Sequence, residues 1–220
     1  MAIKIPLPAA APRALPEPGS HLGACFSVIH CGTQDTAFGA KPQLRLVFEL
    51  GDAFLDDGRP MAIARTYSLS WHPNSALRSD LEGWLGAVAV DFDLADLVGR
   101  SAVIGIAHST GNNGTTYANL TSLLRPHPGT ATRWKLVNAP VVVTPYDFDH
   151  DMFNGLPDWL RGKLLASPEY KVAVKGGEIA PERLHARLQQ AIGVAPADEP
   201  KPRAAKRSRL TGDLDDEIPF

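Results

Sequence analysis

Aromatic and cationic side chains recur together between residues 38 and 71 and again near residues 117–125. Arg65, Tyr67 and Trp71 share one parity of a predicted strand, and Arg45 occupies the polar face of another. Aromatic faces stack on the bases of a single strand, and neighbouring cations neutralise its phosphates. The residues that could supply this chemistry are Phe38, Lys41, Arg45, Arg65, Tyr67, Trp71, Tyr117 and Arg125.

These residues also have a purely structural interpretation. Tyr67 and Trp71 are large enough to belong to the core, and Phe38 could close one end of a barrel. The cations could instead form ion pairs with nearby carboxylates, namely Arg45 or Arg65 with Glu49 or Asp80. On the sequence alone, both interpretations stay open.

The end of the sequence combines charge with apolar bulk. Four acids precede Ile218 and Pro219, and the final residue is Phe220. Most acidic runs are simply solvated. Here, however, a partner could bury the Phe220 ring, meet its carboxylate with a cation and attract the acids with a basic rim. The predicted partner-binding residues are Asp213, Asp215, Asp216, Glu217, Ile218, Pro219 and Phe220.

Other polar clusters indicate little further chemistry. A histidine- and cysteine-containing stretch matches none of the spacings of a closed metal site, its members being His21, Cys25, His30 and Cys31. An extended strand would hold the two cysteines about 20 Å apart, too far for a disulfide. The acidic run around His150 is better explained as a solvated loop than as a divalent-ion site. Without a recognisable catalytic motif, we predict a non-enzymatic protein that needs no cofactor or metal.

The elements that position the candidate residues are expected in a definite order. Hydrophobic and β-branched runs predict five strands, at residues 24–31, 43–50, 61–71, 102–107 and 115–124. Residues 76–85 repeat leucine and tryptophan at helical spacing, with Ser75 or Asn74 as the cap and Gly86 as the end. A helix between the third and fourth strands is the order of the five-stranded OB-fold barrel. An unspecified small β-barrel or sandwich with an inserted helix is the alternative.

The flanking segments differ in composition from this predicted barrel. The expected organisation is a proline-rich arm (1–19), an OB-fold domain that binds single-stranded DNA (20–136), a small helical appendage packed on the barrel (137–192), a basic flexible linker (193–210) and a disordered acidic tip (211–220). Helices are predicted near Pro157 and over residues 181–192.

The composition limits the classes of function. A formal net charge of -2 excludes a uniformly basic nucleic-acid coat, so a DNA site would have to be local. No apolar run is long enough to cross a membrane, and the first residues lack a signal-peptide core. We therefore expect a cytoplasmic protein with no membrane partner.

The segment Asp215-Asp216-Glu217-Ile218-Pro219-Phe220 resembles the acidic C-terminal tip of bacterial single-stranded DNA-binding proteins. In that family an OB-fold core binds the strand, and the tip recruits enzymes of replication, repair and recombination. The proline-rich arm, the appendage and the short basic linker depart from the usual pattern. The resemblance therefore implies a divergent relative, of the kind carried by tailed phages, acting in the nucleoid or the host cytoplasm. Tetramer formation is not carried over, and homo-oligomer formation stays open.

The sequence thus predicts a protein that coats single-stranded DNA during replication and recombination and recruits partner enzymes through its tip. The alternative is an OB-fold adaptor that binds protein instead of DNA, which the near-neutral charge favours. A DNA-processing enzyme with the same tail would need a carboxylate metal site, and none stands out in the sequence.

Overall fold

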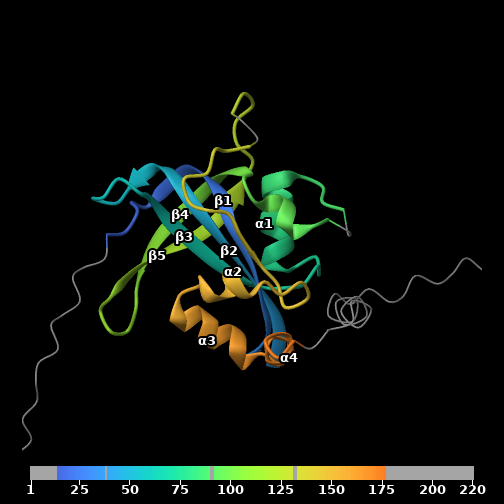
Figure 1. Ribbon diagram of the computed structural model, residues 1–220. Coiled ribbons are helices and arrows are strands. Elements are labelled where there is room, and N and C mark those ends of the chain that lie inside the picture. Colours follow the sequence, from blue (N-terminus) through green and yellow to red (C-terminus); the bar gives the residue numbers. More distant parts are fainter. Residues whose placement is uncertain (1–13, 38, 90–91, 131–132, 177–220) are drawn as a thin grey trace, which may run out of the picture.

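A computed structural model describes residues 14–37, 39–89, 92–130 and 133–176 (Figure 1). The strands are β1 (Gly19–Thr36), β2 (Gly39–Phe54), β3 (Pro60–Ser68), β4 (Ser101–Thr110), β5 (Thr116–Leu124) and β6 (Val141–Val143). The helices are α1 (Ala76–Leu85), the 3-10 helix η1 (Leu94–Leu97), α2 (His150–Asn154), α3 (Asp158–Ala166) and α4 (Pro168–Ala173). Phe38, the predicted helix over 181–192 and the acidic tip lie outside the described residues.

The protein is mainly β, and β1 is the central strand of its sheet. The strand order is β3-β2-β1-β4-β5, with every neighbouring pair antiparallel. β4 pairs with Gly19–Ala24 of β1, and β6 runs parallel to Ser27–Ile29 on the same strand. Irregularities between Cys25 and Ser27 and between His30 and Gly32 increase the local bend of β1. β1 therefore joins the main sheet to the segment that follows residue 140.

Helix α1 has the predicted bounds because its local signals agree. Ser75 accepts a hydrogen bond from the Arg78 amide, and Gly86 ends the helix with a φ of 88°. Leu77, Leu81 and Trp84 form its buried face. These side chains join the inward residues of the sheet in one hydrophobic core.

Strand β3 is shorter than the predicted strand 61–71. Its last backbone contact is the Leu69 amide, which donates to the Pro42 carbonyl at 2.8 Å. Proline has no N–H, so Pro42 cannot continue the ladder on its side. Trp71 consequently lies beyond the strand, in the connection to α1.

A second hydrophobic cluster lies between β1 and the helices α2, α3 and α4. It contains Ile29 and Cys31 of β1, together with Leu160, Leu164 and Tyr170 of the helical segment. Figure 1 shows α2, α3 and α4 gathered at one end of the sheet, apart from α1. Both cysteines are buried free thiols, as their predicted separation required. β1 is therefore buried on both faces.

Close contacts fix α4 on β1. Gly32 has a φ of 67°, and a Cβ at this position would lie 2.3 Å from the Ser167 hydroxyl oxygen. The Glu169 carboxylate accepts hydrogen bonds from the Thr33 amide at 2.9 Å and from its hydroxyl at 2.6 Å. This region holds three short helices, whereas the sequence indicated one or two; Pro157 precedes α3 as expected. Within the described ranges, no helix has both the length and the apolar character needed to cross a membrane.

Candidate nucleic-acid interface

Tyr67 faces the core of the protein. Its side chain is 2 % exposed, and its hydroxyl donates to Asp80 Oδ2 at 2.8 Å. Burial and the neighbouring Asp80 carboxylate raise the pKa of this phenol. Because no ring face is exposed, the expectation that Tyr67 stacks on a base is corrected: Tyr67 is a core residue.

Arg65 is also directed inward, on the same parity of β3. Its Nη1 donates to Asp80 Oδ2 at 2.9 Å and to the Thr121 carbonyl at 3.2 Å. The guanidinium lies 5.0 Å from the centre of the Tyr67 ring. The ion-pair interpretation therefore applies to Arg65, which connects β3 to α1 and to β5. Its charge is compensated by Asp80.

Trp71 is half-buried at the edge of the main core. The guanidinium of Arg78 lies 5.8 Å from the centre of its ring, and Arg78 Nη1 donates to the Trp71 carbonyl at 3.4 Å. Part of the ring surface is thus already covered by a side chain of α1. Of the three β3-region candidates, Trp71 alone keeps surface that a ligand could reach.

Arg45 lies on the outer face of β2, as its parity predicted. Its Nη1 donates to Thr66 Oγ1 of β3 at 3.2 Å, and its guanidinium lies 5.1 Å from the centre of the Trp159 ring. Trp159 is 59 % exposed. Burial lowers the pKa of Arg45, but an arginine remains charged in proteins. A permanent cation and an exposed indole are therefore held side by side.

The outer face beside this pair has a floor of small side chains. Across the β2–β3 ladder, Arg45 is opposite Thr66, and Val47 is opposite Ala64. Ala62 continues this face and is exposed. Small residues on β3 leave the strand surface accessible, so a flat ring could approach it with Trp159 as a side wall.

The segment after β5 closes the far end of this face. Glu49 is 1 % exposed, and its carboxylate accepts hydrogen bonds from the Val137 and Asn138 amides at 3.0 and 2.9 Å. The Asn138 side chain donates to it as well, at 2.9 Å. Glu49 is therefore occupied by the chain itself, and the alternative of an Arg45–Glu49 ion pair does not apply.

Helix α3 places Trp159 beside Arg45. Leu160 and Leu164 are buried one turn apart, which fixes the inner face of α3 on the second cluster. Trp159 and Lys163 occupy the adjacent stripe. Burial raises the pKa of the Cys31 thiol, and the nearby Lys163 and Arg45 oppose this rise. Both cations thus face the same part of β1 and the same outer surface.

The other predicted contact residues lie elsewhere. Tyr117 is 47 % exposed and follows the β4–β5 turn, where its hydroxyl accepts from the Asn113 amide group at 3.4 Å. Lys41 is exposed near the β1–β2 turn and pairs in register with Gln34. Arg125 is exposed beyond β5 and donates to the Leu85 carbonyl at 2.7 Å. Within the described chain, only Arg45 among the predicted residues is brought against an exposed aromatic ring.

Sequence reasoning missed Trp159. The signal was present, because Leu160 and Leu164 define the buried stripe of a short helix and leave Trp159 outside it. Its neighbour in space, however, comes from β2, more than a hundred positions earlier in the chain. No metal-ligand cluster of three or more His, Cys, Asp or Glu side chains occurs in the parts of the chain that the structure describes.

The chain was compared with known proteins. It matches no family model, and no curated protein matches it in sequence. The functional argument therefore depends on the residues themselves.

Proposed function

We propose that the sheet is an OB-type barrel. In support of this proposal, the strand order β3-β2-β1-β4-β5 with α1 between β3 and β4 has the connectivity of that fold. β3 and β5 are the end strands of this order, and the Arg65 side chain makes a direct hydrogen bond from one to the other. The outer face of β2 and β3 is then the surface on which OB folds bind oligonucleotides.

On this surface, the chain binds single-stranded DNA. The observation that carries the proposal is the Arg45–Trp159 pair, in which a cation and a 59 % exposed indole lie 5.1 Å apart over small side chains. An exposed ring stacks on any base, and an adjacent arginine supplies phosphate neutralisation and cation–π attraction. Lys163, Lys41 and Tyr117 are the further residues that could extend the path.

The acidic tip recruits partner enzymes in this proposal. Phe220 and Ile218 would enter an apolar pocket of the partner, and the acids would steer the encounter electrostatically. The support is the terminal sequence and its resemblance to the tip of bacterial single-stranded DNA-binding proteins. Replacing Phe220 with Ala should abolish pull-down of a partner while leaving oligonucleotide affinity unchanged.

Titration of labelled oligo(dT) at several salt concentrations tests the DNA-binding proposal. The parent should bind, and its affinity should fall as salt rises. Trp159→Ala should weaken binding by about 1 to 3 kcal/mol, because one stacking platform is lost. Leu165→Ala is the matched control, since it removes an exposed side chain of the same helix about 120° away from Trp159. Failure of the parent to bind at low salt would refute the proposal.

The second candidate function is that of an adaptor that binds protein. The observation that favours it is the exposure of Leu165, Val172 and Val174 on and after the short helices. An adaptor would retain its partner through the tip and this helical surface, and it would not bind oligo(dT) in the same titration.

A further inference from the structure

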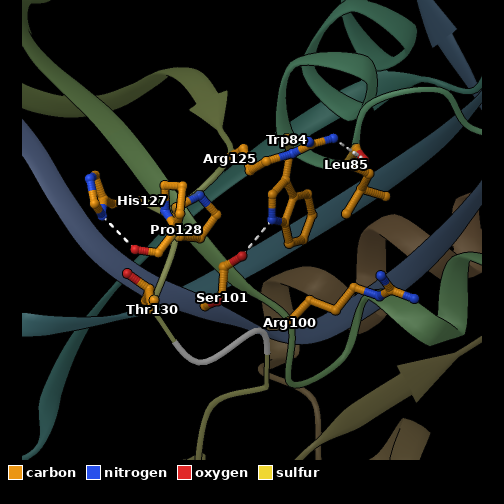
Figure 2. A pocket seen from close by; sticks show the side chains of 10 residues that line it. Trp84, Leu85, Arg100, Ser101, Arg125, His127, Pro128 and Thr130 are labelled. Atoms are coloured by element: carbon orange, nitrogen blue, oxygen red, sulfur yellow. Dashed lines mark hydrogen bonds between the residues drawn. The ribbon is translucent and has the colours of Figure 1, made fainter.

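A cavity of about 280 Å³ lies beside the C-terminal end of α1, away from the Arg45–Trp159 pair. It is formed by the end of α1, the start of β4 and the segment after β5. Figure 2 shows Trp84 and Ser101 on one side, with Pro128 and Thr130 on the other. The lining residues are Trp84, Leu85, Arg100, Ser101, Arg125, Pro126, His127, Pro128, Gly129 and Thr130. Its volume is close to the lower end of the range typical of small-ligand sites.

The charged part of this lining is cationic. Arg125 Nη2 donates to the Leu85 carbonyl at 2.7 Å, and Arg100 Nε donates to the Asp96 carbonyl at 2.9 Å. These bonds orient the two guanidinium groups, each of which has five N–H donors in total. No carboxylate of the described residues forms an ion pair with either arginine. Both retain donors for an anion.

The rest of the lining is largely apolar and rigid. Pro126 and Pro128 have fixed backbone φ angles, and Leu85 adds an aliphatic surface. The Trp84 indole is anchored beneath, because its Nε1 donates to the Ser101 carbonyl at 2.6 Å. Such a site suits a ligand that joins a flat or apolar group to an anion.

A bound strand could reach this cavity from the β2–β3 face across β5. Arg65 already connects β3 to Thr121 of β5, and Arg125 follows four positions further along the chain. β5 contains no acidic residue, and Asn119 and Thr121 are exposed on it. A phosphate backbone would therefore meet no repulsive charge on β5.

We propose that this cavity is a second subsite for single-stranded nucleic acid, which holds one nucleotide of the strand bound at the Arg45–Trp159 pair. The base lies against Leu85, Pro126 and Pro128, and the adjoining phosphate is bound by Arg125 and Arg100. This inference rests on the proposed function, and it assigns Arg125 to a distinct site instead of the β2–β3 face.

Oligonucleotide length separates the two subsites. Oligo(dT) of about six nucleotides should occupy only the Arg45–Trp159 face, whereas oligo(dT) of about twenty should reach both. Arg125→Gln and Arg100→Gln should each weaken binding of the long oligonucleotide by about tenfold, lower its salt slope by about 0.7, and leave the short one unchanged. Arg133→Gln is the matched control, because Arg133 also donates to a backbone carbonyl, that of Val98, but does not line the cavity.

Other outcomes overturn the inference. If both cavity variants bind the long oligonucleotide like the parent, or if they weaken the two lengths equally, the cavity is not a distal nucleotide subsite. If their effect disappears when residues 211–220 are deleted, the cavity binds the acidic tip and not DNA. Unfolding midpoints in urea identify a variant that fails to fold, and the second arginine variant then decides. Absence of parental binding at either length would instead refute the proposed function.

Discussion

Arg45 and Arg65 have similar sequence contexts, but their structural settings differ. Arg65 is paired with Asp80 inside the protein, whereas Arg45 lies at the surface beside Trp159. We therefore predict that Arg45→Gln lowers the slope of log affinity against log salt by about 0.7, because one phosphate contact is lost. Oligo(dT) titration at several salt concentrations measures this slope. Arg59→Gln is the control, since Arg59 is exposed and pairs with Asp57 in another turn. Equal slopes for the parent and Arg45→Gln would contradict the assignment.

Tyr67 provides a test of the correction made above. Tyr67→Phe removes the hydroxyl that donates to Asp80 but keeps the buried ring. The free energy of unfolding should fall by about 1 kcal/mol, the usual net value of such a hydrogen bond, with no change in oligo(dT) affinity. Urea denaturation and the same titration measure the two quantities. A large loss of affinity at unchanged stability would show that the ring contacts DNA after all.

At the scale of elements, the junction between β1 and α4 contains a buried imidazole. His30 Nδ1 accepts from the Gly32 amide at 3.1 Å, and its Nε2 has no hydrogen-bond partner among the described residues. The Tyr146 ring packs edge-on at 5.3 Å, and the Tyr170 hydroxyl donates to the His30 carbonyl at 2.8 Å. Burial lowers the pKa of His30 to about 4, although the Glu169 carboxylate opposes this shift. His30 is therefore neutral in the folded protein at neutral pH.

This imidazole should make stability depend on pH. Between pH values of about 6.5 and 4, the unfolded chain binds a proton at residue 30 and the folded chain does not. Stability should thus be fully present above pH 6.5 and fall with decreasing pH, by up to about 3 kcal/mol at the lower limit. Urea midpoints measured across this range, compared with those of His30→Gln, isolate the effect. If the variant loses stability as steeply as the parent, His30 is not the responsible group.

How far each element could be predicted depends on where its stabilising contacts come from. Helix α1 was predicted correctly because Ser75, the buried leucines and Gly86 all lie within it or next to it. The end of β3 was not, because the residue that stops it is Pro42 on the neighbouring strand. The pairing of β6 with β1 likewise depends on contacts between distant segments, which no local pattern contains.

At the scale of the whole molecule, the candidate interface is assembled from three distant segments. Arg45 comes from β2, Thr66 from β3 and Trp159 from α3, and the helix is held there by its packing on β1. Sequence parity predicted that Arg45 faces outward, but only the packed fold brings Trp159 to it. The region after residue 140 therefore contributes part of the proposed DNA surface, where the sequence suggested an appendage alone.

Photocrosslinking tests the central claim most directly. An oligo(dT) in which one thymine is replaced by 5-iodouracil would be bound, irradiated and digested with the protein, and the crosslinked peptides would be identified by mass spectrometry. Crosslinks should occur at Trp159, and Trp159→Ala should remove them while Leu165→Ala leaves them unchanged. Crosslinks confined to residues outside the β2–β3 face and α3 would contradict the account.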